Sequence, residues 1–231
     1  MAEFFKKYFS KNFFYDILFI FVLSLVLTFA SFLFIDGVVH FSIPFVLLKK
    51  PTILFMNFIP VFILMLIMYF AIGSVGGAFL SVGAMIFIMG VANQNKLFYR
   101  DDNLKITDIV LLKETLGMVK SGVSIKLSPL YFIYPSILIV GGYYLLKIDK
   151  FRLKKIMRFS GAILMCFVGF FTLSNFMTVR DTYWNNSMSL FHPYIEVERA
   201  KDRGMVYTFF YHYKDFFYKK PDVYDEKMVM D

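Results

Sequence analysis

Long runs of apolar residues alternate along the chain with shorter polar sections in which Lys and Arg gather. Most of the runs reach the roughly 20 residues that a helix needs to cross a bilayer. We therefore predict about five transmembrane helices, over residues 13–35, 52–72, 74–93, 130–146 and 159–179. The first run is too long for the core of a signal peptide and is expected to be retained.

Glycines occupy informative positions among these runs. Gly73, Gly76 and Gly77 separate the second run from the third, and they predict a tight turn between two antiparallel helices. Small residues inside membrane helices let two backbones approach closely. We expect such contacts at Gly83, Gly90, Gly161 and Gly169, which lie within the predicted spans.

The longest internal polar section runs from Asn93 to Pro129. Within it, apolar residues recur at helical spacing. Thr107 and Asp108 supply the oxygen and the negative charge that favour the start of a helix. The pattern predicts an amphipathic helix over about 107–121, lying on the membrane surface or against the bundle.

Residues 180–231 form a polar tail that is rich in aromatic residues. Several of these aromatics lie on one helical stripe, which is typical of the belt at a membrane interface. A groove for acyl chains is the less favoured alternative. The predicted interfacial anchors are Trp184, Phe209, Phe210, Tyr213 and Phe217.

Composition supports a membrane protein. Of the 231 residues, 58% are hydrophobic and only 18% are charged, whereas soluble domains average about 45–50% and about 25%. The formal net charge of +8 would also suit a nucleic-acid-binding protein. Here the basic residues flank apolar runs, so the expected anionic partner is the lipid headgroup rather than nucleic acid. The predicted fold class is all-α, a polytopic membrane protein.

Orientation follows from the basic residues, which are retained on the cytoplasmic side. The most compact basic cluster lies between Lys147 and Arg158, and three lysines precede the first run. With five spans, these two clusters lie on the same side. The prediction is a cytoplasmic N-terminus and an extracellular tail, although the basic residues on the two sides are nearly equal in number.

The sequence shows no arrangement of residues that is typical of a catalytic site. His40, His192 and His212 lie in separate segments without the spacing of metal ligands, and no known catalytic or phosphate-binding motif is present. The single cysteine, Cys166, excludes an intrachain disulfide. The spans hold few ionisable residues, which argues against an ion-coupled transporter. Asp16 lies near the polar end of the first run, where we expect its carboxylate to reach water.

Two short stretches go beyond general membrane character. The first is Asn95-Lys96-Leu97-Phe98-Tyr99-Arg100, followed by Leu104, Asp108 and Leu111-Leu112-Lys113-Glu114. It resembles the section between the third and fourth spans of the lipoteichoic acid synthase family, although Lys105 stands where proline is common. The second comprises Trp184-Asn185, Gly204-Met205-Val206-Tyr207 and Lys220-Pro221-Asp222-Val223-Tyr224, and it is similar to the connector of that family.

The resemblance implies a five-helix domain of a bacterial plasma membrane. In family members, this domain is joined to an extracellular sulfatase-fold domain. The second domain uses a threonine nucleophile and a divalent metal, typically Mn²⁺, to transfer glycerol phosphate from phosphatidylglycerol to a growing polymer. No catalytic residue of that domain has a counterpart in this chain, so Mn²⁺ would belong to the other domain. The chain is expected to be the membrane half of such a phosphoglycerol transferase.

The expected function is to anchor and orient a partner domain and to present anionic lipid headgroups such as that of phosphatidylglycerol. Arg100, Lys105 and Lys113 are the candidates for phosphate contact, because Arg offers a bidentate fork and Lys a point charge. The alternative is that they are ordinary interfacial cations. Two other functions stay open: a stand-alone scaffold for another membrane protein, and a small-solute or lipid transporter.

Overall fold

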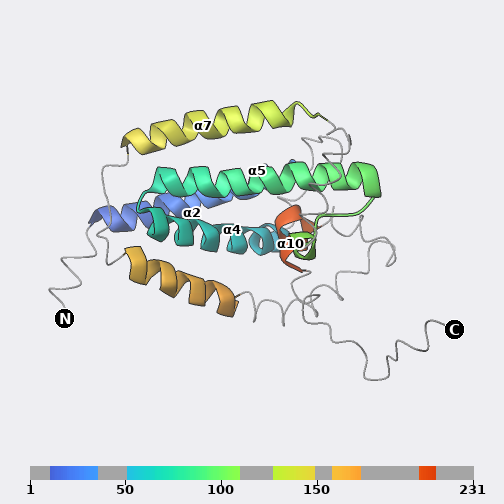
Figure 1. The fold of residues 1–231 in the computed structure, drawn as a ribbon. Helices are drawn as coiled ribbons and strands as arrows, with labels where there is room; N and C mark the ends of the chain where they lie inside the picture. Colours follow the sequence, from blue (N-terminus) through green and yellow to red (C-terminus); the bar gives the residue numbers. More distant parts are fainter. Residues whose placement is uncertain (1–10, 36–50, 110–126, 149–157, 173–202, 212–231) are drawn as a thin grey trace, which may run out of the picture.

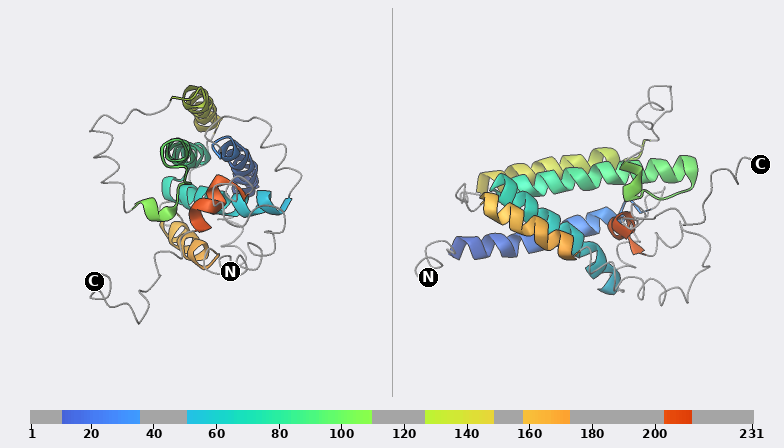
Figure 2. Two further views of the ribbon diagram at one scale, coloured as in Figure 1. Left: turned by 90° about the vertical axis from the view of Figure 1, so that its right-hand side faces the viewer. Right: turned by 60° about the horizontal axis from the view of Figure 1, so that its bottom comes forward.

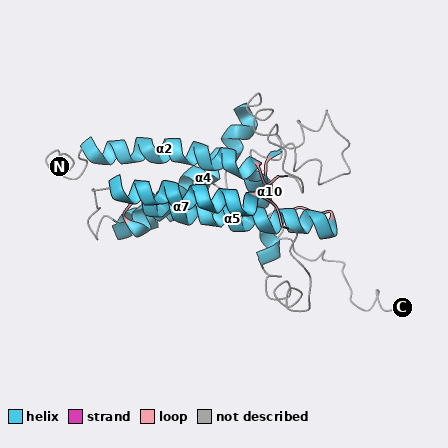
Figure 3. Cartoon of the chain, turned by 90° about the horizontal axis from the view of Figure 1, so that it is seen from above, coloured by secondary structure: helices cyan, strands magenta, loops and turns pink. Residues whose placement is uncertain are grey.

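The computed structural model describes residues 11–35, 51–109, 127–148, 158–172 and 203–211. Within these ranges every regular element is helical, and four helices are long and apolar enough to cross a membrane (Figure 1, Figure 3). They are α2 (Lys11–Phe32), α4 (Pro51–Ile72), α5 (Val75–Arg100) and α7 (Leu130–Ile148). The prediction of an all-α polytopic membrane protein is confirmed.

A shorter apolar helix, Arg158–Thr172, begins where the fifth span is predicted. The rest of that span, residues 173–179, lies outside the described residues, so a fifth crossing stays a prediction. This helix packs on α4, because a Cβ added at Gly161 would overlap the ring of Phe70 and one added at Gly169 would lie 3.0 Å from Ile63 Cγ2.

The helices form a bundle around α5, which contacts α2, α4 and α7, while α2 also packs on α4 (Figure 1, Figure 2). Successive membrane helices run in opposite directions. One end of the bundle, here called the α10 end, holds the C-terminal ends of α2 and α5 and a short helix, α10 (Met205–Tyr211). The opposite end holds the turn between α4 and α5 and is called the Gly73 end.

The turn between α4 and α5 confirms the interpretation of the glycine-rich sequence. Gly73 has φ of +82°, which a residue with a side chain rarely adopts, and its N–H donates to Tyr69 O at 2.7 Å. Ser74 then caps α5, with its side-chain oxygen accepting a hydrogen bond from the Gly77 N–H at 3.0 Å.

Close helix packing at glycine is also confirmed. A Cβ added at Gly83 would overlap Leu138 of α7, and one added at Gly90 would overlap the ring of Phe34, which follows α2. The fully buried Phe34 ring lies edge-on to the rings of Phe87 and Tyr134. Without a side chain at residue 90, the end of α2 can lie directly on α5.

The third span does not end where the polar section begins. The predicted end is residue 93, but α5 continues to Arg100, which makes it 26 residues and about 39 Å long. Polar side chains alone do not end a helix, and these find partners beside it. The helix ends at Asp101, whose φ of 48° is left-handed and whose N–H donates to Leu97 O at 3.1 Å.

Only the start of the predicted amphipathic helix can be compared with the structure. Ile106–Ile109 forms a 3₁₀ helix, η1, and residues 110–121 lie outside the described residues. Thr107 therefore lies inside the first turn instead of at its cap, whereas Asp108 provides the predicted acidic residue.

The first span is also shorter than predicted, since residues 33–35 leave α2 in tighter i→i+3 turns.

Candidate functional site

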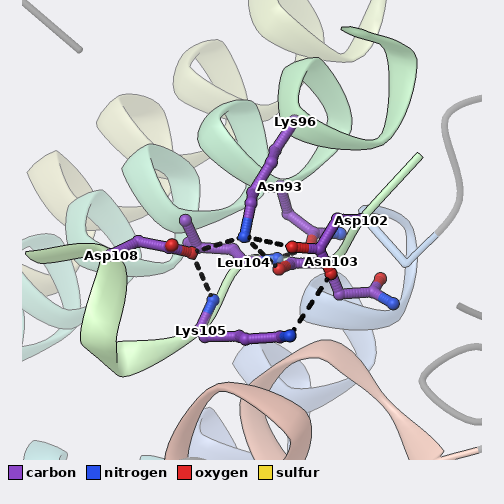
Figure 4. A network of polar contacts seen from close by, with 7 residues as sticks. All are labelled: Asn93, Lys96, Asp102, Asn103, Leu104, Lys105 and Asp108. Atoms are coloured by element: carbon purple, nitrogen blue, oxygen red, sulfur yellow. Dashed lines mark hydrogen bonds and ion pairs between the residues drawn. The ribbon is translucent and has the colours of Figure 1, made fainter. Parts of the chain in front are cut away.

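An ion cluster lies at the α10 end, where α5 leaves the bundle (Figure 4). At its centre is Lys96, whose Nζ lies 2.8 Å from Asp102 Oδ2 and 2.8 Å from Asp108 Oδ2. The same Nζ donates to the backbone oxygen of Asn103 at 2.8 Å. Because the Lys96 side chain is only 11% exposed, its charge depends on these partners instead of on water.

Asp108 ties the polar segment after α5 into a defined turn. Its Oδ2 accepts a hydrogen bond from the Lys105 N–H at 2.7 Å, which satisfies a backbone donor just before η1. Lys105 Nζ lies 3.5 Å from Asp102 Oδ1. The cluster thus contains two cations and two carboxylates and is balanced in charge.

Asn93 joins three parts of the chain at the same end. Its Nδ2 donates to Phe34 O, beyond the end of α2, at 2.9 Å. Its Oδ1 accepts from the Leu104 N–H at 2.9 Å. Since Asn93 is 2% exposed, both bonds are shielded from water. This one amide therefore fixes residues 33–35 and the segment after α5 against the same turn of α5.

Asn57 holds α10 against α4 in a similar way. Its Nδ2 donates to Ile53 O at 2.9 Å and to Arg203 O at 2.7 Å, while its Oδ1 accepts from the Tyr207 N–H at 2.9 Å. Asn57 is 0% exposed. Gly204 has φ of +91°, and a Cβ there would overlap the Asn57 amide. The fit therefore requires both the amide at residue 57 and a glycine at residue 204.

Buried polar side chains are concentrated at the α10 end. Those shared between elements include Asn57 and Asn93, and Gln94, Asn103 and Arg203 are also buried there. By contrast, the buried hydroxyls of Ser24, Thr28 and Ser31 donate to carbonyl oxygens of their own helix. At the α10 end, polar side chains therefore join separate segments through bonds to their backbone atoms.

The structure places the predicted site residues in different surroundings. Lys105 belongs to the ion cluster, and Arg100 is exposed as the last residue of α5. Phe209 is buried, 7% exposed, because α10 packs on the bundle. Phe210 is half-buried against the core. Lys113, Trp184, Tyr213 and Phe217 lie outside the described residues.

Sequence reasoning missed the roles of Asn57 and Asn93. The sequence alone could have singled out Asn57, because it is an amide inside an apolar run, where an unpaired polar group is costly. Lys96 was noticed only as part of a resemblance, and Asp108 was noticed also as an acidic residue at the start of the predicted amphipathic helix. The structure shows that the two halves of that stretch contact each other through this ion pair.

The Gly73 end carries two further polar contacts. Arg158 Nη2 donates to Ala71 O, in the last turn of α4, where a cation is favoured. Tyr69 Oη donates to Asp16 Oδ2 at 2.7 Å. The prediction that Asp16 simply reaches water is therefore incomplete, because its carboxylate also connects α2 to α4.

Replacing Tyr69 by phenylalanine is expected to lower the stability of the bundle by about 1 kcal/mol, the usual net value of one hydrogen bond. The ring, which is 0% exposed, keeps its packing, so the loss reports the bond to Asp16. The measurement is the apparent melting temperature in detergent, by size-exclusion chromatography after heating. Asp16→Asn, which retains an acceptor, should lose less. Equal melting of Tyr69→Phe and the unmodified protein would contradict this role.

The described residues contain no group of three or more His, Cys, Asp or Glu that could hold a metal ion. The balanced ion cluster is suited to joining segments instead of to acid–base chemistry, since each carboxylate faces a lysine. Comparisons with family models, with curated proteins and with solved structures find no match for this chain.

Proposed function

We propose that this chain is a non-catalytic membrane domain that anchors and orients the segment following its last span. The observation that supports this most directly is the attachment of α10 to α4 by Asn57, through hydrogen bonds to backbone atoms on both sides of Gly204. A tether that only retains a protein at a membrane needs no such contact. Backbone clamping fixes where the chain leaves the bundle.

The burial of α10 adds to this argument. Met205, Val206, Tyr207 and Phe209 are all buried, against α2, α4 and η1. At about 25 cal/mol for each Å² of apolar surface removed from water, several buried large side chains stabilise the docked position by some kcal/mol. The position of α10, from which the chain continues, is therefore set by the bundle.

In the family setting that the sequence resembles, the oriented partner is a sulfatase-fold phosphoglycerol transferase domain. We place the protein in a bacterial plasma membrane, with the N-terminus in the cytoplasm and the α10 end outside. Lys147, in the last turn of α7, and Arg158, which lies against Gly73, support this orientation because both of these cations are at the Gly73 end. The ion cluster would then lie at the level of the outer headgroups.

Arg100 is the best-placed candidate for contact with an anionic headgroup. It is exposed at the tip of α5, next to the exposed rings of Phe98 and Tyr99. Arg100→Ala is expected to weaken phosphatidylglycerol binding by the purified protein several-fold, because a bidentate phosphate contact is lost. The measurement is native mass spectrometry with titrated phosphatidylglycerol.

The matched control for this prediction is Lys147→Ala, which removes an exposed cation at the Gly73 end of α7. An equal loss in both variants would indicate general charge attraction and contradict a specific headgroup contact at Arg100. An unchanged affinity in Arg100→Ala would leave this residue as an ordinary interfacial cation.

The proposal as a whole is tested by native mass spectrometry of the protein extracted from its own membrane. A species much larger than 27.1 kDa that carries phosphatidylglycerol would support the anchor of a polymer-building enzyme. A species of 27.1 kDa that co-purifies with another membrane protein, and with no particular lipid, would favour the scaffold function and overturn the enzymatic setting.

A further inference from the structure

The two groups of polar contacts at the α10 end lie against each other. One is the ion cluster on residues 101–109, and the other is α10 with its Asn57 clamp. α10 packs on η1, which contains Asp108, and its ribbon passes beside Lys105 in Figure 4. α10 also contacts α2, near the residues that Asn93 fixes. We call residues 101–109 and 203–211 together the cap.

We infer that the cap is one cooperative unit, in which the docking of α10 controls whether Lys96 and Lys105 stay paired with Asp102 and Asp108. This inference rests on contacts within the chain and holds whether or not the proposed function is correct. It makes α10 a switch as well as an attachment point.

The physical cause is the screening of the ion pairs. The attraction between two charges falls steeply as water replaces protein around them. Lys96 is 11% exposed and Asp108 is 20% exposed while α10 lies on η1. Withdrawal of α10 hydrates this cluster and weakens the pairs that shape residues 101–109. The two lysines then face the solvent or anionic headgroups without their carboxylates.

Coupling also operates in the other direction, because an energetic link between two sites is reciprocal. The turn of residues 101–109 presents η1 to α10, and this turn depends on Lys96 and Asp108. Loosening the ion cluster removes one wall of the α10 site. Asn57 then retains its bonds to α10 with less packing around them.

The experiment is hydrogen–deuterium exchange of the full chain in nanodiscs of phosphatidylethanolamine and phosphatidylglycerol. Gly204→Ala forces α10 away, since the added Cβ overlaps the Asn57 amide at a positive φ. We expect about tenfold faster exchange in 203–211 and also in 101–109, the change that one lost hydrogen bond produces. Amides 73–78 at the opposite end should not change.

Two further variants complete the test. Asn57→Leu removes the clamp from the α4 side and should reproduce the effect of Gly204→Ala. Gly141→Ala is the matched control, because a Cβ there makes only ordinary contact, at 3.6 Å from Phe79. The reciprocal variant Lys96→Met should speed exchange in 203–211.

The outcomes are distinct. Faster exchange in 203–211 with unchanged exchange in 101–109 would overturn the inference, because α10 would then move alone. Unchanged exchange in 203–211 in both Gly204→Ala and Asn57→Leu would also overturn it, because the clamp would not hold α10. Neither outcome depends on lipid binding or on a partner domain, so the proposed function is judged separately.

Discussion

Replacing Lys96 by methionine is expected to destabilise the folded chain by about 3 kcal/mol, the lower end of the range for breaking a buried ion pair. Methionine retains the aliphatic packing, but Asp102 and Asp108 each lose a cation at 2.8 Å. The lower end applies because the carboxylates are partly exposed, at 32% and 20%. The measurement is the apparent melting temperature in detergent, at low and at high salt.

Two comparisons show whether this loss arises from the cluster. Lys105→Met removes a cation that is 3.5 Å from its carboxylate and 21% exposed, so it should cost no more than about 1 kcal/mol. Adding Asp108→Asn to Lys96→Met should recover part of the loss, because the stranded charge is also removed. Additive losses in the double variant would contradict the pairing of Lys96 with Asp108.

Replacing Gly90 by alanine is expected to cost about 1–3 kcal/mol, the usual penalty for overfilling a packed core. The new methyl group would overlap Phe34 at the base of its ring, which is 0% exposed and held by neighbouring rings. The ring cannot swing aside, so α2 must move away from α5. The same change at Gly141 meets only an ordinary contact and should stabilise its helix slightly.

The pair of alanine variants is measured by melting temperature in the same detergent. Because both changes add one methyl group to a helix, they differ only in the neighbouring side chains. A lower melting temperature for Gly90→Ala alone would support the packing described here. Equal melting temperatures would mean that α2 and α5 do not lie as close as the structure places them.

The sequence was sufficient to predict four membrane helices and one turn. An apolar run predicts a membrane helix because, apart from a closed β-barrel, only a helix satisfies its own backbone polar groups in lipid. Gly73, Gly76 and Gly77 predicted the turn, since a positive φ such as that of Gly73 is a local requirement that glycine meets. The end of α5 could not be predicted in this way, because the polar residues after 93 are stabilised by partners that come from other segments.

The site was less predictable for the same reason. Asn57 and Arg203 are 146 positions apart, and no local pattern shows that one binds the other. The sequence predicts that Phe209 is an interfacial aromatic because its neighbours in sequence are aromatic and charged. Its burial depends on α10 docking on α4, which is a property of tertiary packing and not of the helical stripe.

The position of Asn93 along α5 has a consequence for the membrane itself. The part of α5 that precedes Asn93 is about 27 Å long, slightly less than the roughly 30 Å of a typical hydrocarbon core. A thicker bilayer would draw Asn93 and Lys96 toward the acyl chains, whereas a thinner one leaves them hydrated. Hydrophobic mismatch would therefore act first on this polar end. Acyl-chain length is thus a variable to which the protein's stability should respond.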